Sequence, residues 1–166
     1  MTQPVRTTIT LLALGLVLAV AAVWGWNAAT KPLPAKVDSA ICVDTDVAQG
    51  DKIYPQQVTV SVYNAGRREG LAGRTMQLLT DAGFAKGNAG NAASAKVDTV
   101  AIWTTTPESP DVRLVASYFD APEIKRREGP GSGVTVIVGD GFKTLAEGKR
   151  AVRAEADATI CSPPVS

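Results

Sequence analysis

The chain has 166 residues, with 17 basic side chains, 16 acidic side chains and no histidine. A net charge of +1 creates no strong field toward nucleic acid, so nucleic acid is not an expected partner. The lack of histidine excludes serine–histidine and cysteine–histidine nucleophile pairs and most catalytic zinc sites.

The first feature along the chain is an uncharged, mostly apolar segment from Thr7 to Ala29. About 20 apolar residues are enough to cross the hydrocarbon core of a membrane. Trp24 and Trp26 lie at the end of the segment, where indole rings favour the lipid–water interface. We therefore expect a short cytoplasmic N-terminus over residues 1–6, a single transmembrane helix over residues 7–29, and an extracytoplasmic remainder.

Two alternatives compete with an uncleaved membrane anchor. A cleaved signal peptide has an apolar core of about 7–15 residues and small residues at its cleavage site. Here Trp26 or Asn27 occupies a position where a small residue is required. The other alternative is a buried core helix, but such helices seldom stay uncharged over so long a stretch. After the anchor, residues 30–56 are expected to form a linker, stiffened by Pro32 and Pro34, and an N-terminal arm.

The two cysteines, Cys42 and Cys161, lie near the two ends of the expected extracytoplasmic part. Outside the cytoplasm, such a pair is most simply a disulfide, with two free thiols as the alternative. Similar residues, Ala40-Ile41 and Thr159-Ile160, precede the cysteines and suggest two short strands lying side by side. A closed loop of this length stabilises a fold by roughly 4–5 kcal/mol in the chain-entropy model.

The first half of the expected domain alternates strands with a helix. Asp44–Pro55 is polar and is interpreted as a connection. Gln57–Tyr63 alternates apolar and polar residues and predicts a strand with one buried face. Gly70–Ala82 has apolar residues at helical spacing, and Gly83 follows as a C-cap. Phe84–Asn91 then adds a short strand.

The second half repeats this alternation. Thr99–Thr105 predicts a strand, and Ser109 followed by Pro110 is typical of a helix start. The charged segment Glu123–Glu128 predicts an edge strand, which would discourage edge-to-edge pairing. Val134–Val138 is the most hydrophobic strand outside the anchor and so the best candidate for a central position.

The end of the chain completes the expected fold. Phe142–Arg153 has a helical composition, and a last strand carries Cys161. The whole order predicts an α/β fold, an α+β sandwich with a mixed β-sheet and two helices packed on one face. Helical crossovers between parallel strands are expected to be right-handed.

Short motifs in residues 57–142 resemble one protein family. They are Val58-Thr-Val-Ser-Val-Tyr-Asn-Ala-Gly66, Gly70-Leu-Ala-Gly73, Leu78-Leu-Thr-Asp-Ala-Gly-Phe84, Thr99–Trp103, the helix after Pro110, and Val134-Thr-Val-Ile-Val-Gly-Asp-Gly-Phe142. Their order and spacing resemble the LytR C-terminal domain family, extracytoplasmic domains of bacterial, chiefly actinobacterial, cell-envelope proteins. The resemblance leaves residues 143–166 as a C-terminal arm.

The resemblance implies an envelope function. Many family members carry an upstream catalytic domain that transfers anionic glycopolymers onto peptidoglycan. The short stretch between the anchor and the first matched strand leaves no room for such a domain, so neither transferase activity nor a cofactor is expected. We expect a non-catalytic, membrane-anchored protein that supports wall or membrane integrity by binding an anionic wall polymer or an envelope protein.

Two other functions stay open. One is a protein-interaction module of a division or secretion complex, with the edge strand at Glu123–Glu128 available for strand addition. The other is a small envelope hydrolase or transferase that works through carboxylates. The pairing of such carboxylates is spatial and cannot be read from the sequence.

The best candidate binding site is the turn from Asn64 to Gly70, between a strand end and a helix start. Backbone N–H groups at a helix N-terminus, with Arg67 and Arg68 beside them, are suited to a phosphate or carboxylate of a wall polymer. The turn lacks the Gly-Lys-Ser/Thr ending of a phosphate loop. The alternative is structural: Asn64 and the glycines satisfy special backbone angles, and the arginines are solvated.

Two further charged clusters are candidate binding sites. Lys125-Arg126-Arg127 is suited to anionic lipid or polymer, although three basic residues on a charged strand are more often a solvated edge. Asp44, Asp46 and Asp51 invite a calcium site, but Ala48 stands at the fifth ligand position of the loop. No metal is therefore expected.

Overall fold

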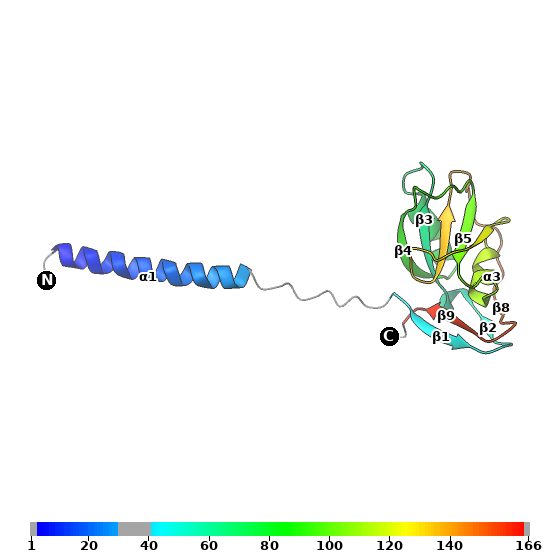
Figure 1. The fold of residues 1–166 in the computed structure, drawn as a ribbon, viewed down its shortest axis with the longest axis horizontal. Coiled ribbons are helices and arrows are strands. Elements are labelled where there is room, and N and C mark those ends of the chain that lie inside the picture. Colours follow the sequence, from blue (N-terminus) through cyan, green and yellow to red (C-terminus); the bar gives the residue numbers. More distant parts are fainter. Residues whose placement is uncertain (1–2, 30–40, 165–166) are drawn as a thin grey trace. The chain divides into compact units, whose positions relative to one another are not determined.

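The structure is a computed structural model that describes residues 3–29 and 41–164 (Figure 1). The chain divides after Asp38 into two units. The predicted linker at residues 30–36 lies outside the described residues, and so do the first two residues of the predicted cytoplasmic N-terminus.

The N-terminal unit contains the helix α1, which spans Gln3–Ala29 and so begins before the predicted Thr7. Pro4 is tolerated in the first turn, where its missing N–H group would have no partner in the helix. The side chains described from residue 11 to residue 26 are exposed. Across the described residues, no helix combines the length and the apolar character set for a membrane span. The predicted helix is confirmed, whereas its crossing of a membrane stays a prediction.

The C-terminal unit is built on a five-stranded mixed sheet, as predicted (Figure 1). Its strands in chain order are β3 (Thr59–Asn64), β4 (Ala85–Asn91), β5 (Val100–Thr104), β6 (Glu123–Arg126) and β7 (Val134–Val138). Their spatial order is β4-β3-β7-β5-β6. β4, β3 and β7 run parallel to one another, while β5 is antiparallel to β7 and parallel to β6.

Two predicted strand positions are confirmed. β7 lies in the centre of the sheet, and every one of its five side chains is buried. The charged β6 lies at an edge, where Glu123, Lys125 and Arg126 make pairing with another sheet unfavourable. Uncharged strands therefore occupy the positions that are covered on both faces.

Both helices of the C-terminal unit cover one face of this sheet, as predicted. The helix α2 spans Leu71–Asp81 and α3 spans Pro110–Ala116. Residues from both helices share one buried cluster with alternate strand residues, among them Val60, Val62, Ile102, Val134, Val136, Leu79, Met76, Leu114 and Val115. Strand side chains alternate between faces, so the intervening residues point away from the helices.

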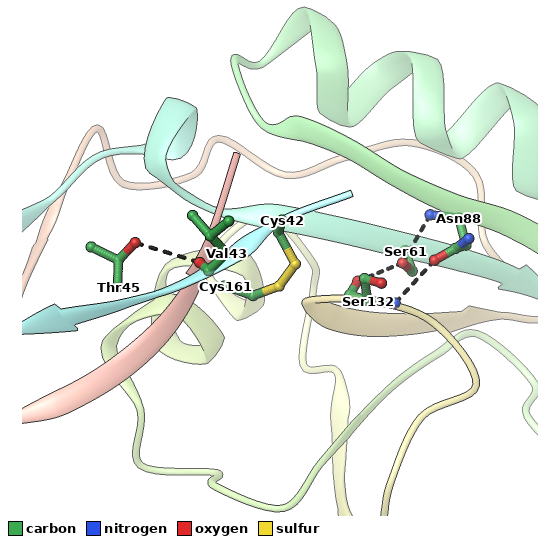
Figure 2. The surroundings of a disulfide bond; sticks show 7 residues. All are labelled: Cys42, Val43, Thr45, Ser61, Asn88, Ser132 and Cys161. Atoms are coloured by element: carbon green, nitrogen blue, oxygen red, sulfur yellow. Dashed lines mark hydrogen bonds between the residues drawn. A yellow bond between two sulfur atoms is a disulfide. The ribbon is translucent and has the colours of Figure 1, made fainter. Parts of the chain in front are cut away.

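Ala92, Ala95 and Val97 pack over one part of the opposite face of the sheet. Another part is covered by the glycine-rich segment 129–133. Figure 2 shows how it is held: the Ser61 hydroxyl donates to the Ser132 carbonyl over 2.6 Å, and the Ser132 N–H donates to Asn88 Oδ1 over 3.0 Å. At Gly133, φ is +70° and a Cβ atom would overlap the Thr59 carbonyl. Only glycine combines this left-handed backbone with so close an approach.

Two small ribbons join the ends of the C-terminal unit. β1 (Val43–Val47) pairs antiparallel with β9 (Ala158–Ser162), and β2 (Lys52–Ile53) pairs antiparallel with β8 (Val152–Arg153). A disulfide joins Cys42 to Cys161, whose Cα atoms lie 5.4 Å apart (Figure 2). The disulfide is confirmed, and so is the strand at Thr159-Ile160, which is part of β9. The strand expected at Ala40-Ile41 instead begins after Cys42, at Val43, since Ile41 is outside β1 and Ala40 lies outside the described residues.

The prediction that Asp44–Pro55 is a plain connection was wrong, since it contains most of β1 and all of β2. Four of the five residues in β1 are exposed, so the strand has no apolar alternation to identify it. Its structure comes from pairing with β9, more than a hundred residues later in the chain.

The prediction of helical structure over Phe142–Arg153 was also wrong, because the segment is irregular until β8. It lies along the end of α3, where the Ala146 N–H donates to the Tyr118 carbonyl over 2.8 Å. A Cβ atom at Gly148 would overlap the Tyr118 ring. Contacts with α3 therefore replace the local hydrogen bonds of a helix.

Candidate functional site

The turn from Asn64 to Gly70 follows β3 and leads into α2, as predicted. Asn64 is buried, and its side chain closes the turn from inside. Its Nδ2 donates to the Arg68 carbonyl over 2.8 Å, and its Oδ1 accepts the Gly66 N–H over 2.8 Å. Gly70 has φ +70° at the N-cap of α2. These two residues therefore shape the turn, which favours a structural role for them over ligand binding.

The backbone N–H groups of the turn already have an anion inside the protein. The Asp140 carboxylate accepts the Arg67 N–H over 2.9 and 3.0 Å and the Arg68 N–H over 3.1 Å. The Arg67 amide first and the Arg68 amide next hold the pKa of Asp140 below its ordinary value, because hydrogen bonds favour the ionised carboxyl. A bound polymer would therefore not find these amides unoccupied.

The two arginine side chains of the turn differ in their contacts. Arg68 Nη1 donates to the carbonyls of Asp140, over 3.2 Å, and of Phe142, over 2.8 Å. These acceptors are neutral and fix the guanidinium, while the Asp140 carboxylate on the Arg68 N–H offsets part of its charge. For Arg67, no side-chain hydrogen bond is found within the described part of the chain, and the residue is exposed.

The Arg68 side chain opens onto a groove of about 370 Å³ along α2, here called the cationic groove. Its lining consists of Arg68, Leu71, Arg74, Thr75, Gln77, Leu78, Phe142 and Lys143. Three of these residues are cations, and none of the described lining residues is acidic. Leu71, Leu78 and Phe142 give the floor an apolar character. Such a lining is suited to a negatively charged group attached to a less polar body.

Two of the three cations in the cationic groove, Arg74 and Lys143, were not predicted from the sequence. Arg74 lies on α2 one turn after Gly70, so the helical spacing of the segment was a signal that could have found it. Lys143 lies far along the chain, and only the irregular path after β7 brings it to the groove. No sequence signal indicated this placement.

The depression beside the cationic groove has balanced charge. It measures about 550 Å³ and is lined by Arg67 and Lys96 together with Asp98 and Asp140. Two cations facing two carboxylates offer no net attraction to an anion. The cationic groove is therefore the better candidate for an anionic ligand, although this depression is larger.

The basic triplet on and after β6 has partners within the protein. Lys125 pairs with Glu123 at 3.1 Å, and Arg126 Nη1 donates to the Thr105 carbonyl over 3.2 Å. The Arg127 guanidinium stacks 3.8 Å from the Trp103 ring centroid. These contacts favour the structural interpretation of the triplet over a ligand site.

The carboxylates that suggested a calcium site make separate hydrogen bonds within the protein. Asp46 Oδ1 accepts the Thr159 hydroxyl over 3.0 Å, and Asp51 Oδ2 accepts the Ala48 N–H over 3.0 Å. Each carboxylate is thus used to hold β1 and its turn. Within residues 41–164, the structure brings no group of three acidic or cysteine ligands together around a common point.

A buried carboxyl lies at the start of α3. Burial raises the pKa of Asp111 above its ordinary value, against the opposing hydrogen bonds from the Ser109 hydroxyl and the Val112 N–H. The predicted helix start is confirmed at Pro110, but Ser109 donates to Asp111 instead of capping the helix with its side chain. Both hydrogen bonds reach Asp111 Oδ1, which thus holds the first turn of α3.

Comparison with known proteins identifies the family. Residues 57–142 match the family model described as LytR cell envelope-related transcriptional attenuator. The chain belongs to this family. The predicted resemblance is confirmed, and the matched span contains α2, Asp140 and every member of the cationic groove except Lys143.

Other comparisons add little to the family match. No curated protein matches the chain. A solved structure, the soluble domain of a conserved hypothetical secreted protein from Mycobacterium marinum, is similar to it at 24% identity. That similarity covers 60% of this chain and 77% of the other, with a TM-score of 0.48.

Proposed function

We propose that this protein is a non-catalytic, membrane-anchored component of the bacterial cell envelope that binds an anionic wall polymer in the cationic groove. The observation that carries the proposal is the set of three cations, Arg68, Arg74 and Lys143, in a groove with no acidic lining residue among those described. Membership in a cell-envelope-related family supports an envelope setting. Binding of this kind would support wall or membrane integrity by tethering one layer to the other.

The chemistry of the groove favours a polymer over a small free anion. The whole chain carries a net charge of only +1, so it exerts little long-range attraction on an anion. The attraction of the groove cations reaches about 8 Å at physiological ionic strength, because salt screens exposed charges beyond that distance. Exposed charge contacts contribute little one at a time. A polymer presents many equivalent anionic groups near the groove, which raises the effective concentration of the next group after one is released.

A non-catalytic role agrees with the chemistry of the chain. It contains no histidine, and the buried Asp111 carboxyl is engaged by Ser109 and by a backbone amide. The Asp140 carboxylate is bonded to the Arg67 and Arg68 amides, and the Asp81 carboxylate accepts the side-chain amide of Gln77 in the cationic groove. Carboxylates used in this way are poorly placed to transfer protons to a substrate.

The first test reverses two charges of the cationic groove. Arg74→Glu with Lys143→Glu is expected to weaken retention on purified wall sacculi at least about tenfold, which corresponds to about 1.4 kcal/mol. Attraction is replaced by repulsion at both positions. Arg74→Glu also removes an exposed hydrogen bond of 3.0 Å from Arg74 Nη2 to the Glu69 carbonyl in the turn. Both residues are exposed, so the free energy of unfolding is expected to change by less than about 0.5 kcal/mol.

The matched control is Lys86→Glu with Lys149→Glu, which changes the net charge equally at exposed residues outside the groove. Its retention is expected to equal that of the unchanged protein. Sacculi stripped of their covalently attached polymers serve as the blank. Equal retention of the groove variant and the control variant would rule out the groove as the binding site.

The membrane anchor is part of the same proposal and rests on the apolar composition of α1. The full-length protein is expected to stay with the membrane fraction after a carbonate wash, because such a wash releases peripheral proteins and leaves spanning helices inserted. Immunoblotting of pellet and supernatant measures the distribution. Recovery of a shortened, soluble form that begins near Thr30 or Ala35 would favour a cleaved signal peptide instead.

The alternative function, a protein-interaction module of a division or secretion complex, rests on the edge position of β6. Strand addition there is disfavoured by the charges on β6 and by its length of four residues. Identification of membrane proteins that co-purify with the full-length chain, in parallel with the sacculus assay, separates the two functions.

A further inference from the structure

Asp140 connects the turn after β3 to the segment after β7, and it does so through its side chain and its backbone together. Its carboxylate accepts the Arg67 and Arg68 N–H groups, and its carbonyl accepts Arg68 Nη1 over 3.2 Å. The next acceptor of Arg68 Nη1 is the Phe142 carbonyl, two residues later. The main chain and the side chain of Arg68 are thus both held by the segment that ends at Lys143.

These contacts bear directly on the cationic groove. Arg68 comes from the turn and Lys143 from the segment after β7, so the two cations share one groove only while these segments stay together. The contact of Asp140 with Gly66 is also close, since a Cβ atom at position 66 would overlap the Asp140 carboxylate. The absence of a side chain at Gly66 therefore lets the carboxylate reach the amides.

We propose that Asp140 is a positioning residue for anion binding: its carboxylate binds no ligand itself but holds Arg68 in place in the cationic groove. The proposal rests on the function proposed above and adds a residue whose charge has the wrong sign for direct contact with the ligand. It therefore makes a prediction opposite to that of simple electrostatics.

Electrostatics alone predicts that removal of a negative charge beside a cationic groove strengthens the binding of an anion. The positioning role predicts instead that the loss of Asp140 weakens this binding. Asp98 provides the matched comparison, because it lines the same depression as Asp140. Within the described residues, the Asp98 side chain makes no hydrogen bond, so its charge can be removed without disturbance of the turn.

The experiment compares three variants of the full-length protein in detergent, with wall sacculi as the probe. Asp140→Ala removes both the charge and the contact, Asp98→Asn removes a charge only, and Gly66→Ala displaces the carboxylate while its charge stays. We expect retention to fall about five- to tenfold for Asp140→Ala and for Gly66→Ala, which is the effect of a modest loss of preorganisation. Asp98→Asn is expected to retain at least as well as the unchanged protein.

Two further measurements separate positioning from general loss of structure. Thermal melting confirms that each variant is folded at the assay temperature. Amide proton shifts of Arg67 and Arg68 are expected to move in Asp140→Ala and Gly66→Ala but not in Asp98→Asn. A folded Gly66→Ala variant keeps the proposal testable even if Asp140→Ala does not fold.

The outcomes are distinct. Weaker retention in both contact variants, with Asp98→Asn unaffected, supports the proposal. Unchanged or tighter retention in a folded Asp140→Ala or Gly66→Ala variant overturns it, even where the unchanged protein binds sacculi through its groove. Failure of the unchanged protein to bind sacculi overturns the proposed function instead.

Discussion

Cys42→Ser, Cys161→Ser and the double variant are expected to lose the same free energy of unfolding, about 2–5 kcal/mol. One bond is lost in each case, and that bond closes a loop with a sequence separation of 119 residues. The loss is large because β1 and β9 hold few buried side chains of their own, Val47 and Ile160 among them. Without the disulfide, the ordering of both arms depends mainly on backbone pairing.

Urea unfolding measures the three variants. The unchanged protein in the presence of a strong reductant is the control, and its stability is expected to fall to that of the serine variants. The variants themselves are expected not to respond to the reductant. A double variant that loses the sum of the two single losses would contradict a shared bond, since contributions add only for independent sites.

Leu79→Ala is expected to lower the free energy of unfolding by about 2–5 kcal/mol, while Leu78→Ala costs less than about 1 kcal/mol. The residues are neighbours on α2, but Leu79 is 0% exposed in the main core and Leu78 is 36% exposed. Removal of the Leu79 side chain loses buried apolar area and leaves a cavity between α2 and the sheet. Removal of the Leu78 side chain changes only the lining of the cationic groove.

Urea unfolding of the two variants under identical conditions checks this prediction, because both make the same chemical change on the same helix. Equal losses would mean that α2 does not bury Leu79 against the sheet. The face of α2 that carries Arg74 into the groove would then be assigned wrongly, and the proposed site would have to be rebuilt.

Local patterns were enough for the elements of the central sheet. The alternation around Val58–Val62 and the apolar run Val134–Val138 predicted β3 and β7, and helical spacing predicted α2. The helix α2 buries one face and β7 buries all of its side chains, as their patterns indicate. For β3 the prediction of one buried face was wrong, because the segment 129–133 covers Thr59 and Ser61 on the other face. The exposed β1 and the irregular segment before β8 have no burial pattern in their sequence, so the predicted structure of each was wrong.

The candidate site was predicted in part. The turn, Arg68 and the nearby helix start were found because a strand end, a glycine-bounded turn and a helix lie in sequence. The occupant of the turn amides could not be found in this way, because Asp140 comes from another strand end more than seventy residues later. Parallel pairing of β3 with β7 puts the two strand ends side by side, and strand order is not written in any local pattern.

By itself the sequence determined the alternation of strands and helices, the disulfide and the family, since periodicity, cysteine count and motif spacing do not depend on which strands pair. Only the tertiary structure decided that Arg68, Arg74 and Lys143 share one groove, and that Asp140 fills the turn expected to hold a ligand. The reason is physical. These contacts join residues distant in sequence, and the strand pairing that brings them together is set by the burial of the whole core.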